Sequence, residues 1–220
     1  MQDEEIIAAV RPYTSVSRER ILNVLTLVES VVREGIPGDF AEVGVWKGGL
    51  IMAMALKCRQ LGAEDRVIHA YDTFTGMTEP TNLDMDLWGE SAKSLLSRSE
   101  YKDGTASFHA FASKELVGKI LNDNGCFDVN LIEGDVAKTL LVKSNLPSHI
   151  SILRLDTDWY ESTKIELEIL YPLLVPGGIL IIDDYGHFSG ARKAVDEYFK
   201  DDLPFMFHVD YSCRMIIKKR

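Results

Sequence analysis

The chain has 220 residues, of which 46% are hydrophobic, and its formal net charge is −10. This length suits one α/β domain with a substantial core, so we expect residues 1–220 to form a single domain. The negative charge argues against nucleic acid or an anionic membrane surface as a partner. Three widely spaced cysteines, an acidic start unlike a signal peptide and no apolar run of roughly 18 residues predict a cytoplasmic protein.

The first strongly periodic stretch begins at residue 17. Apolar residues at helical spacing predict a helix over 17–34, with Ser17 as its N-cap and Gly35 just beyond its end. The segment before it is polar and interrupted by Pro12. We therefore expect residues 1–16 to be an N-terminal arm that lies over another part of the molecule.

A strand, a glycine-rich loop, a helix and a second strand follow in that order. The strands are predicted over 40–44 and 67–71, and a long apolar helix over 50–61 separates them. This is the order of the nucleoside-binding half of a doubly wound sheet, in which the acid after the second strand can hold ribose hydroxyls. Asp72 occupies that position and is therefore a candidate cofactor contact.

The loop after the first strand differs from a dinucleotide-binding loop. It begins at Glu42 and continues through Gly44 to two glycines, without the spacing GxGxxG. The carboxylate of Glu42 would repel a pyrophosphate, but it suits the ammonium or sulfonium end of S-adenosyl-L-methionine. Glu42 and Gly44 are thus candidate contacts to that cofactor; the alternative is a tight turn without a ligand.

Residues 73–111 interrupt the alternation of strands and helices. The stretch begins with a turn-rich sequence, and a short helix is expected over 84–97. Connections of this length are usually functional, so we expect a lid-like insertion. A purely structural excursion is the alternative.

The rest of the chain completes the α/β pattern. A helix over 113–124 and a strand over 129–133 lead to Asp135, which either accepts a hydrogen bond from the adenine amino group or caps the next helix. The remaining elements are strands over 150–155 and 179–182, helices over 160–174 and 189–200, and a hairpin of 205–209 with 213–217. The predicted fold is α/β, a Rossmann-like doubly wound, mostly parallel seven-stranded sheet with a C-terminal antiparallel hairpin.

Two of the apolar strands end in carboxylates. Asp156 and Asp158 follow one strand, and Asp183 and Asp184 follow the next. Ligands bind beyond the carboxyl ends of such strands, so these side chains are expected to converge. Two charges 4 Å apart repel by about 4 kcal/mol at an effective dielectric constant of about 20. A cation among them is therefore expected, and Mg²⁺ suits the oxygen ligands; helix capping is the alternative. His187 is the histidine near this crevice.

These motifs together resemble class I S-adenosylmethionine-dependent methyltransferases. Within that class the chain is similar to the macrocin O-methyltransferase family, which methylates sugar hydroxyls on macrolide and aminocoumarin antibiotics. The resemblance covers nearly the whole chain. The matching stretches are 35–40, 42–49, 72–77, 133–135, 155–163, 176–178 and 183–186.

The resemblance implies a role for each matching residue. It implies that Asp156, Asp183 and Asp184 hold Mg²⁺ and that Asp158 is the general base. The cofactor-binding residues it implies are Tyr13, Thr14, Glu42, Gly44, Asp72, Thr73, Asp135 and Asp156. Of these, Tyr13 and Thr14 resemble an arm that folds over the cofactor. A homodimer or a higher homo-oligomer is also implied.

The sequence thus predicts a Mg²⁺-dependent O-methyltransferase of antibiotic or other natural-product biosynthesis. It would move the methyl group of S-adenosyl-L-methionine to a hydroxyl of a small molecule, a sugar or another vicinal diol. Three alternatives remain open: a catechol-type enzyme acting on phenols, a nicotinamide-dependent oxidoreductase, against which Glu42 argues, and a non-catalytic cofactor-binding protein.

Overall fold

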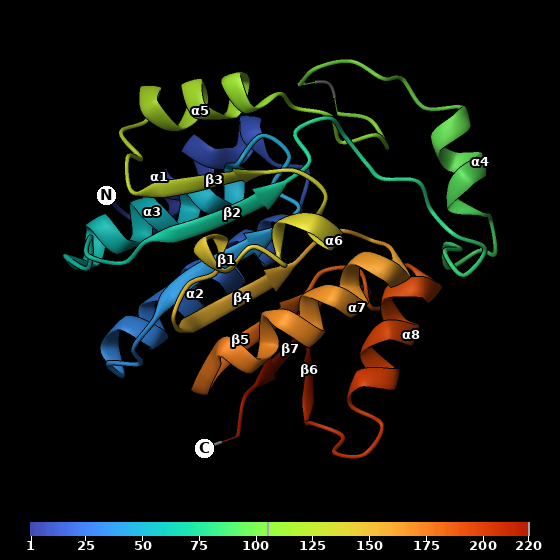
Figure 1. The fold of residues 1–220 in the computed structure, drawn as a ribbon. Coiled ribbons are helices and arrows are strands. Elements are labelled where there is room, and N and C mark those ends of the chain that lie inside the picture. Colours follow the sequence, from blue (N-terminus) through green and yellow to red (C-terminus); the bar gives the residue numbers. More distant parts are fainter. Residues whose placement is uncertain (105, 220) are drawn as a thin grey trace.

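The computed structural model describes residues 1–104 and 106–219, and it contains one seven-stranded sheet (Figure 1). The strands are β1 Asp39–Val43, β2 Ile68–Asp72, β3 Val129–Glu133, β4 Ile150–Leu155, β5 Leu174–Ile182, β6 Met206–His208 and β7 Arg214–Ile217. Their order is β3-β2-β1-β4-β5-β7-β6; the first five are parallel, and β7 is antiparallel to β5 and β6. The predicted doubly wound sheet and its C-terminal hairpin are confirmed.

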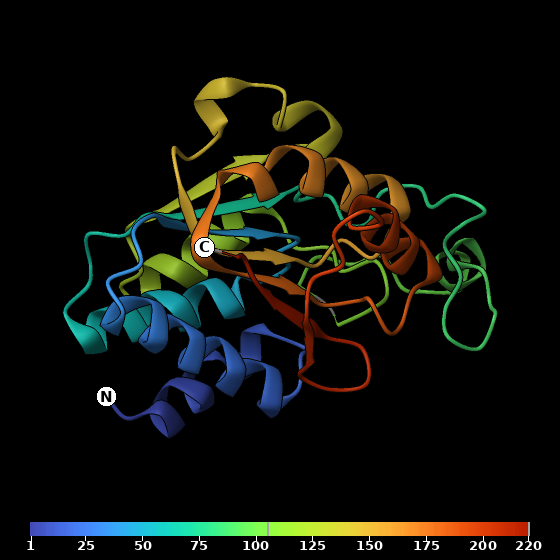
Figure 2. The same cartoon turned by 90° about the horizontal axis from the view of Figure 1, so that it is seen from below.

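Helices cover both faces of the sheet, as Figure 2 shows. They are α1 Asp3–Val10, α2 Arg18–Arg33, α3 Gly49–Leu61, α4 Ala92–Ser97, α5 Lys114–Asp123, α6 Val136–Thr139, α7 Tyr160–Ile169 and α8 Ser189–Tyr198. One buried cluster joins the sheet to α1, α2, α3 and α5, with Leu25 and Val117 among its members. A second joins it to α6, α7 and α8 and includes Leu167 and Val195. In the described part of the chain, none of the helices has the length and apolarity that crossing a membrane requires.

Strand β4 lies in the middle of the sheet, and all of its residues are buried. Ile152 packs on the α2 side, whereas Leu153 and Leu155 pack on the α7 side. A strand that is buried on both faces needs apolar residues on both, which explains why four of its six residues are apolar. The polar exceptions are Ser151 and Arg154, at 0% and 1% exposure, and a charge at that depth needs charged partners.

Residues 1–16 are part of the folded core and do not form only an arm. They contain α1, whose Ile6, Ile7 and Val10 are buried in the same cluster as α2 and α3. Lys57 of α3, itself buried, pairs with Asp3 of α1. A helix of eight residues carries too short a periodic pattern to stand out in a sequence. The helix is instead stabilised by its packing against α2 and α3.

The insertion between β2 and α5 passes beyond the carboxyl ends of the parallel strands (Figure 1). The helix expected over 84–97 is wrong in extent, because only α4 is helical. Asp84 and Asp86 are the reason: their carboxylates accept hydrogen bonds from backbone N–H groups of the insertion itself. Short acidic side chains compete with a helix in this way. The helix predicted over 160–174 likewise ends early, and a 3₁₀ turn that contains Pro172 follows it.

Candidate active site

A cavity of about 760 Å³ opens at the carboxyl ends of the strands, where the strand order reverses between β1 and β4. Small-molecule sites usually have about 300–1,000 Å³. The insertion supplies part of the wall, including Met77 and Phe108. The predicted site residues that line the cavity are Gly44, Asp72, Thr73, Asp156, Asp158, Asp183 and Asp184.

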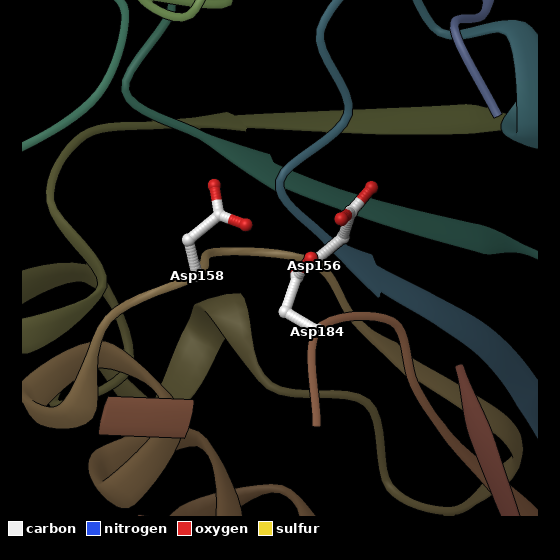
Figure 3. Close-up of side chains that lie close together, drawn as sticks. All are labelled: Asp156, Asp158 and Asp184. Carbon is white, nitrogen blue, oxygen red and sulfur yellow. The ribbon is translucent and has the colours of Figure 1, made fainter. Parts of the chain in front are cut away.

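Three of these aspartates lie close together (Figure 3). One oxygen from each of Asp156, Asp158 and Asp184 lies within 4.8 Å of the other two. The register of the sheet explains this, because Leu155 of β4 pairs with Ile182 of β5. The loops that follow the two strands therefore start side by side, at the edge where ligands bind in open α/β sheets.

Asp183 has surroundings unlike those of its neighbour Asp184. Its Oδ1 accepts a hydrogen bond from Arg154, and its Oδ2 accepts one from Arg20 of α2. Arg20 also donates to the carboxylate of Asp210, at 2.6 Å from its Nε. The predicted metal ligand Asp183 thus lies outside the three-carboxylate cluster, with both oxygens paired to arginines.

Arg154 is the buried cation that holds the carboxylates of the site together. Its Nη1 donates to Glu42 and to Asp156, each at 2.6 Å, and its Nη2 donates to Asp183. Burial alone would lower the pKa of Arg154, but the carboxylates, with Asp156 first, raise it well above its usual value. The sequence motifs did not point to this residue. The available signal was a single charged residue inside a strand that is mostly apolar.

Burial raises the pKa of Asp158, Asp184 and Glu42. Burial raises the pKa of Asp158 to about 7, although a hydrogen bond with Asp184 opposes the rise. Burial and then the charge of Asp158 raise the pKa of Asp184 well above its ordinary value. The pKa of Glu42 is raised to about 8, again by burial first, although Arg154 opposes the shift. In the absence of a cation, several of these groups therefore hold protons near neutral pH.

The backbone at Asp158 is strained, with φ at 65°. Such strain costs about 1–3 kcal/mol and recurs at functional sites. Two contacts hold the surrounding loop in place. Thr157 donates its hydroxyl to Glu166 at 2.8 Å, and Asp84 accepts from the backbone N–H of Tyr160 at 2.8 Å. The position of Asp158 is therefore supported from both α7 and the insertion.

The glycine loop and Asp72 form another wall of the cavity. Asp72 accepts hydrogen bonds from the backbone N–H groups of Val45 and Trp46, at 2.7 and 3.1 Å. A Cβ on Gly44, whose φ is 82°, would lie 1.9 Å from the carbonyl oxygen of Asp156. The loop therefore requires glycine at this position, and Asp72 ties the loop to β2 while bordering the cavity.

Tyr13 and Thr14 lie beside the cavity instead of lining it. They pack across the start of α3, where a Cβ on Gly49 would lie 2.5 Å from the Tyr13 carbonyl oxygen. The next residues, 15–17, line the cavity in their place. The N-terminal segment thus reaches the site, through residues slightly later in the chain than those predicted.

Two further cofactor candidates, Glu42 and Asp135, are not among the residues that line the cavity. Glu42 is 2% exposed and pairs with Arg154. Asp135 caps α6 by accepting a hydrogen bond from the backbone N–H of Ala137 at 3.0 Å, which is one of the two roles left open by the sequence. Its neighbour Gly134 lines the cavity.

Aromatic side chains complete the wall, and no motif pointed to most of them. The Trp46 Nε1 is buried and has no hydrogen-bond partner within the described residues. Phe108 of the insertion packs with Trp159 at a ring distance of 6.0 Å. His187 also lines the cavity, with its Nδ1 3.3 Å from the Tyr211 hydroxyl, and burial lowers the pKa of His187.

Comparison with known proteins gives the family. Residues 8–215 match the sequence model of the macrocin-O-methyltransferase family, TylF. The chain belongs to this family. The resemblance inferred from the motifs is thereby confirmed, and it makes the protein an O-methyltransferase.

Relatives span most of the chain. One is 8-demethyl-8-(2,3-dimethoxy-alpha-L-rhamnosyl)-tetracenomycin-C 4'-O-methyltransferase from Streptomyces olivaceus, 34% identical over 187 residues that cover 84% of this chain and 67% of that protein. Another is mycinamicin III 3''-O-methyltransferase from Micromonospora griseorubida, 30% identical over 190 residues that cover 84% and 70%. The structure of the O-methyltransferase NovP superposes with a TM-score of 0.81 at 27% identity, covering 94% of this chain and 83% of that one.

Proposed function

We propose that the chain transfers the methyl group of S-adenosyl-L-methionine to a sugar hydroxyl of a natural product, with Mg²⁺ as a second cofactor. The observation that carries the proposal is the cluster of Asp156, Asp158 and Asp184 in a cavity that the Gly44 loop also borders. Family membership supports the reaction type. The relative from Streptomyces olivaceus is named for methylation of a rhamnosyl compound, which supports a sugar as acceptor.

The cavity fits S-adenosyl-L-methionine in several respects. The Gly44 loop brings the backbone of β1 against that of the β4 loop, so no side chain blocks the space between them. The carboxylates along the wall suit a cationic sulfonium. The buried Trp46 Nε1, which lacks a partner among the described residues, is placed to donate a hydrogen bond to a bound cofactor. Asp72 and Thr73 also border the space, on the side proposed for the ribose.

The three-carboxylate cluster fits Mg²⁺. All its donors are carboxylate oxygens, the ligand type that Mg²⁺ prefers, and the buried Asp184 Oδ2 has no partner within the described residues. Asp156 and Asp184 belong both to this cluster and to the ligand set predicted from the sequence. Bound Mg²⁺ would lower the pKa of a hydroxyl that coordinates it.

Asp158 is the proposed general base. In the metal-free protein burial raises its pKa to about 7. With Mg²⁺ held by Asp156 and Asp184, the positive charge would keep Asp158 ionised, so that its carboxylate could accept the proton of the acceptor hydroxyl. Glu166 and Asp84 hold the loop on either side of it, so the carboxylate is positioned before the acceptor binds. In-line transfer needs the acceptor oxygen about 3–3.5 Å from the methyl carbon, and the cavity wall provides the orientation.

Binding and turnover measured on the same variants test this proposal. We expect Asp158→Asn to bind S-adenosylhomocysteine like the wild type while kcat on a glycoside acceptor falls about 10²–10⁴-fold. Asp201→Asn, the same substitution at an exposed site, is the control and keeps full turnover. Normal turnover of Asp158→Asn would show that Asp158 is not the general base. No binding of S-adenosylhomocysteine to the wild type would overturn the proposal, and transfer to catechols in preference to glycosides would favour the phenolic alternative.

Mn²⁺ binding, followed by electron paramagnetic resonance without acceptor, tests the metal site. Asp184→Asn is expected to weaken binding by at least tenfold, because it removes a donor from the cluster. An Asp183→Asn variant separates the two candidate ligand sets. Unchanged Mn²⁺ affinity supports the cluster alone, and a loss equal to that of Asp184→Asn supports the set predicted from the sequence.

We also propose a single domain with an insertion that acts as a lid over the acceptor. The sheet shares its two buried clusters with helices from both ends of the chain, which supports one domain. The homo-oligomer and the cytoplasmic location remain predictions. Sedimentation at several protein concentrations measures the former.

A further inference from the structure

Three buried polar atoms in the cavity wall have no hydrogen-bond partner within the described residues. They are the Oδ2 of Asp184, the Nε1 of Trp46 and the Oγ of Ser107. Native proteins rarely leave such an atom unpaired, so each one requires an explanation, and a bound ligand is one. The proposed function uses Asp184 for the metal and Trp46 for the cofactor. It leaves the Ser107 hydroxyl, which belongs to the insertion, without a role.

Ser107 belongs to a turn, residues 106–110, that packs on the loop after β2. The Ser107 carbonyl accepts a hydrogen bond from the backbone N–H of Ala110 at 3.1 Å, which closes the turn. The His109 carbonyl accepts one from the backbone N–H of Met77 at 2.9 Å. The turn is therefore joined to the loop that follows the second strand of the nucleoside-binding half of the sheet.

Phe108 anchors the same turn to the starts of α7 and α8. Its ring packs with those of Trp159 and Phe188, in both cases with 6.0 Å between ring centroids. Its backbone N–H donates to the Ser99 hydroxyl at 2.8 Å. These contacts, together with those to the loop after β2, fix the position of the Ser107 hydroxyl before a ligand binds.

The backbone of the turn is strained at Ala110. Its φ is 46°, in a region that residues other than glycine rarely adopt. Within the described chain, the non-glycine residues with positive φ are Trp46, Phe74, Ala110 and Asp158, and all of them except Phe74 line the cavity. Strain of this kind recurs at ligand clamps and active sites. The strain at Ala110 therefore supports a role of the turn in ligand binding.

The position of the turn indicates the adenosyl part of the cofactor as its ligand. In doubly wound sheets the nucleoside lies at the half that contains β1, β2 and β3, whereas the acid cluster follows β4 and β5. Two side chains predicted for the adenosyl side are already bonded within the protein. Asp72 accepts from three backbone N–H groups, and Asp135 caps α6. By contrast, no described residue uses the Ser107 hydroxyl.

We propose that residues 106–110 are part of the cofactor site and that the Ser107 hydroxyl forms a hydrogen bond with the adenosyl moiety. This inference rests on the proposed function, in which the insertion covers the acceptor. The insertion then serves both ligands of the enzyme. The Ser107 hydroxyl contributes to the affinity for the cofactor and not to the stability of the unliganded fold.

Calorimetric titration of the full chain without acceptor tests this inference. The ligands are S-adenosylhomocysteine and 5′-methylthioadenosine, which lacks the amino-acid end. Ser107→Ala should bind both about 3–10-fold more weakly than the wild type, the usual effect of losing one neutral hydrogen bond. Ser107→Cys, which keeps the size of the side chain but not the hydroxyl, should show a similar loss. Ser97→Ala, at an exposed serine of α4, is the control and should bind like the wild type.

The melting temperature of the unliganded protein separates a binding role from a structural one. Ser107→Ala should unfold at the same temperature as the wild type, because the hydroxyl has no partner to lose among the described residues. A lower melting temperature would assign Ser107 a structural role and overturn the inference. Unchanged affinity for both ligands, or a loss confined to S-adenosylhomocysteine, would also overturn it. Failure of the wild type to bind S-adenosylhomocysteine would instead overturn the proposed function itself.

Discussion

The edge of the sheet and residues 83–88 of the insertion, here called the rim, both contain buried aspartates, with opposite consequences. At the sheet edge, Asp183 is paired with arginine side chains, while Asp158 and Asp184 keep carboxylates in the cavity. At the rim, Asp84 and Asp86 bind backbone N–H groups of the loop, and apolar side chains face solvent instead. The kind of partner that a buried acid finds therefore decides whether a region offers charge or apolar surface to a ligand.

Loss of Arg154 at the sheet edge should have the largest effect on stability. Arg154→Met leaves Glu42, Asp156 and Asp183 without their shared cation, so we expect the free energy of unfolding to fall by about 3–5 kcal/mol. Urea denaturation measures the loss. It should be smaller at pH 5 than at pH 8, because Glu42, with a pKa near 8, is protonated at the lower pH. A loss under 1 kcal/mol would mean that the carboxylates do not depend on Arg154.

The corresponding change at the rim should have a smaller effect. Asp84→Ala removes the acceptor for the backbone N–H groups of Thr81 and Tyr160, and the expected cost is about 1–3 kcal/mol. The same urea titration measures the loss. No measurable loss would show that these two N–H groups do not depend on Asp84.

Substitution of Arg20 should lower the free energy of unfolding less than substitution of Arg154. Arg20→Gln leaves Asp183 with its bond from Arg154, and the Arg20 side chain is 12% exposed. We expect a loss of about 1 kcal/mol, measured by the same urea titration. A loss as large as that of Arg154→Met would contradict the view that Arg154 is the central cation of the site.

The pH dependence of stability gives a further test. Burial raises the pKa of Glu166 from 4.5 to about 8 in the folded protein. Its protonated form therefore stabilises the fold fully below about pH 4.5, and this contribution is lost as the pH rises towards 8. The melting temperature of the metal-free protein should fall over this range, and it should fall less in Glu166→Gln, which has no carboxyl proton to lose. An identical fall in both proteins would show that Glu166 does not hold its proton.

Much of the fold was predictable because it depends on local pattern. The strands over 129–133 and 150–155 were predicted to the residue, and α3 ends at Leu61 as expected. Errors occurred where distant contacts override that pattern. Helix α1 depends on packing against α2 and α3, and the start of the insertion is held by Asp84 and Asp86 instead of forming a helix.

The candidate site shows the same division. The sequence alone determined that carboxylates follow β4 and β5 and that a glycine loop follows β1, because apolar runs and turn residues are local properties. Only the tertiary structure decided which carboxylates are paired and which remain available. Those pairings join residues far apart in the chain, such as Glu42 with Arg154, 112 residues away, and Asp183 with Arg20, 163 residues away. No local pattern encodes such a contact, since it exists only once the sheet and α2 have packed together.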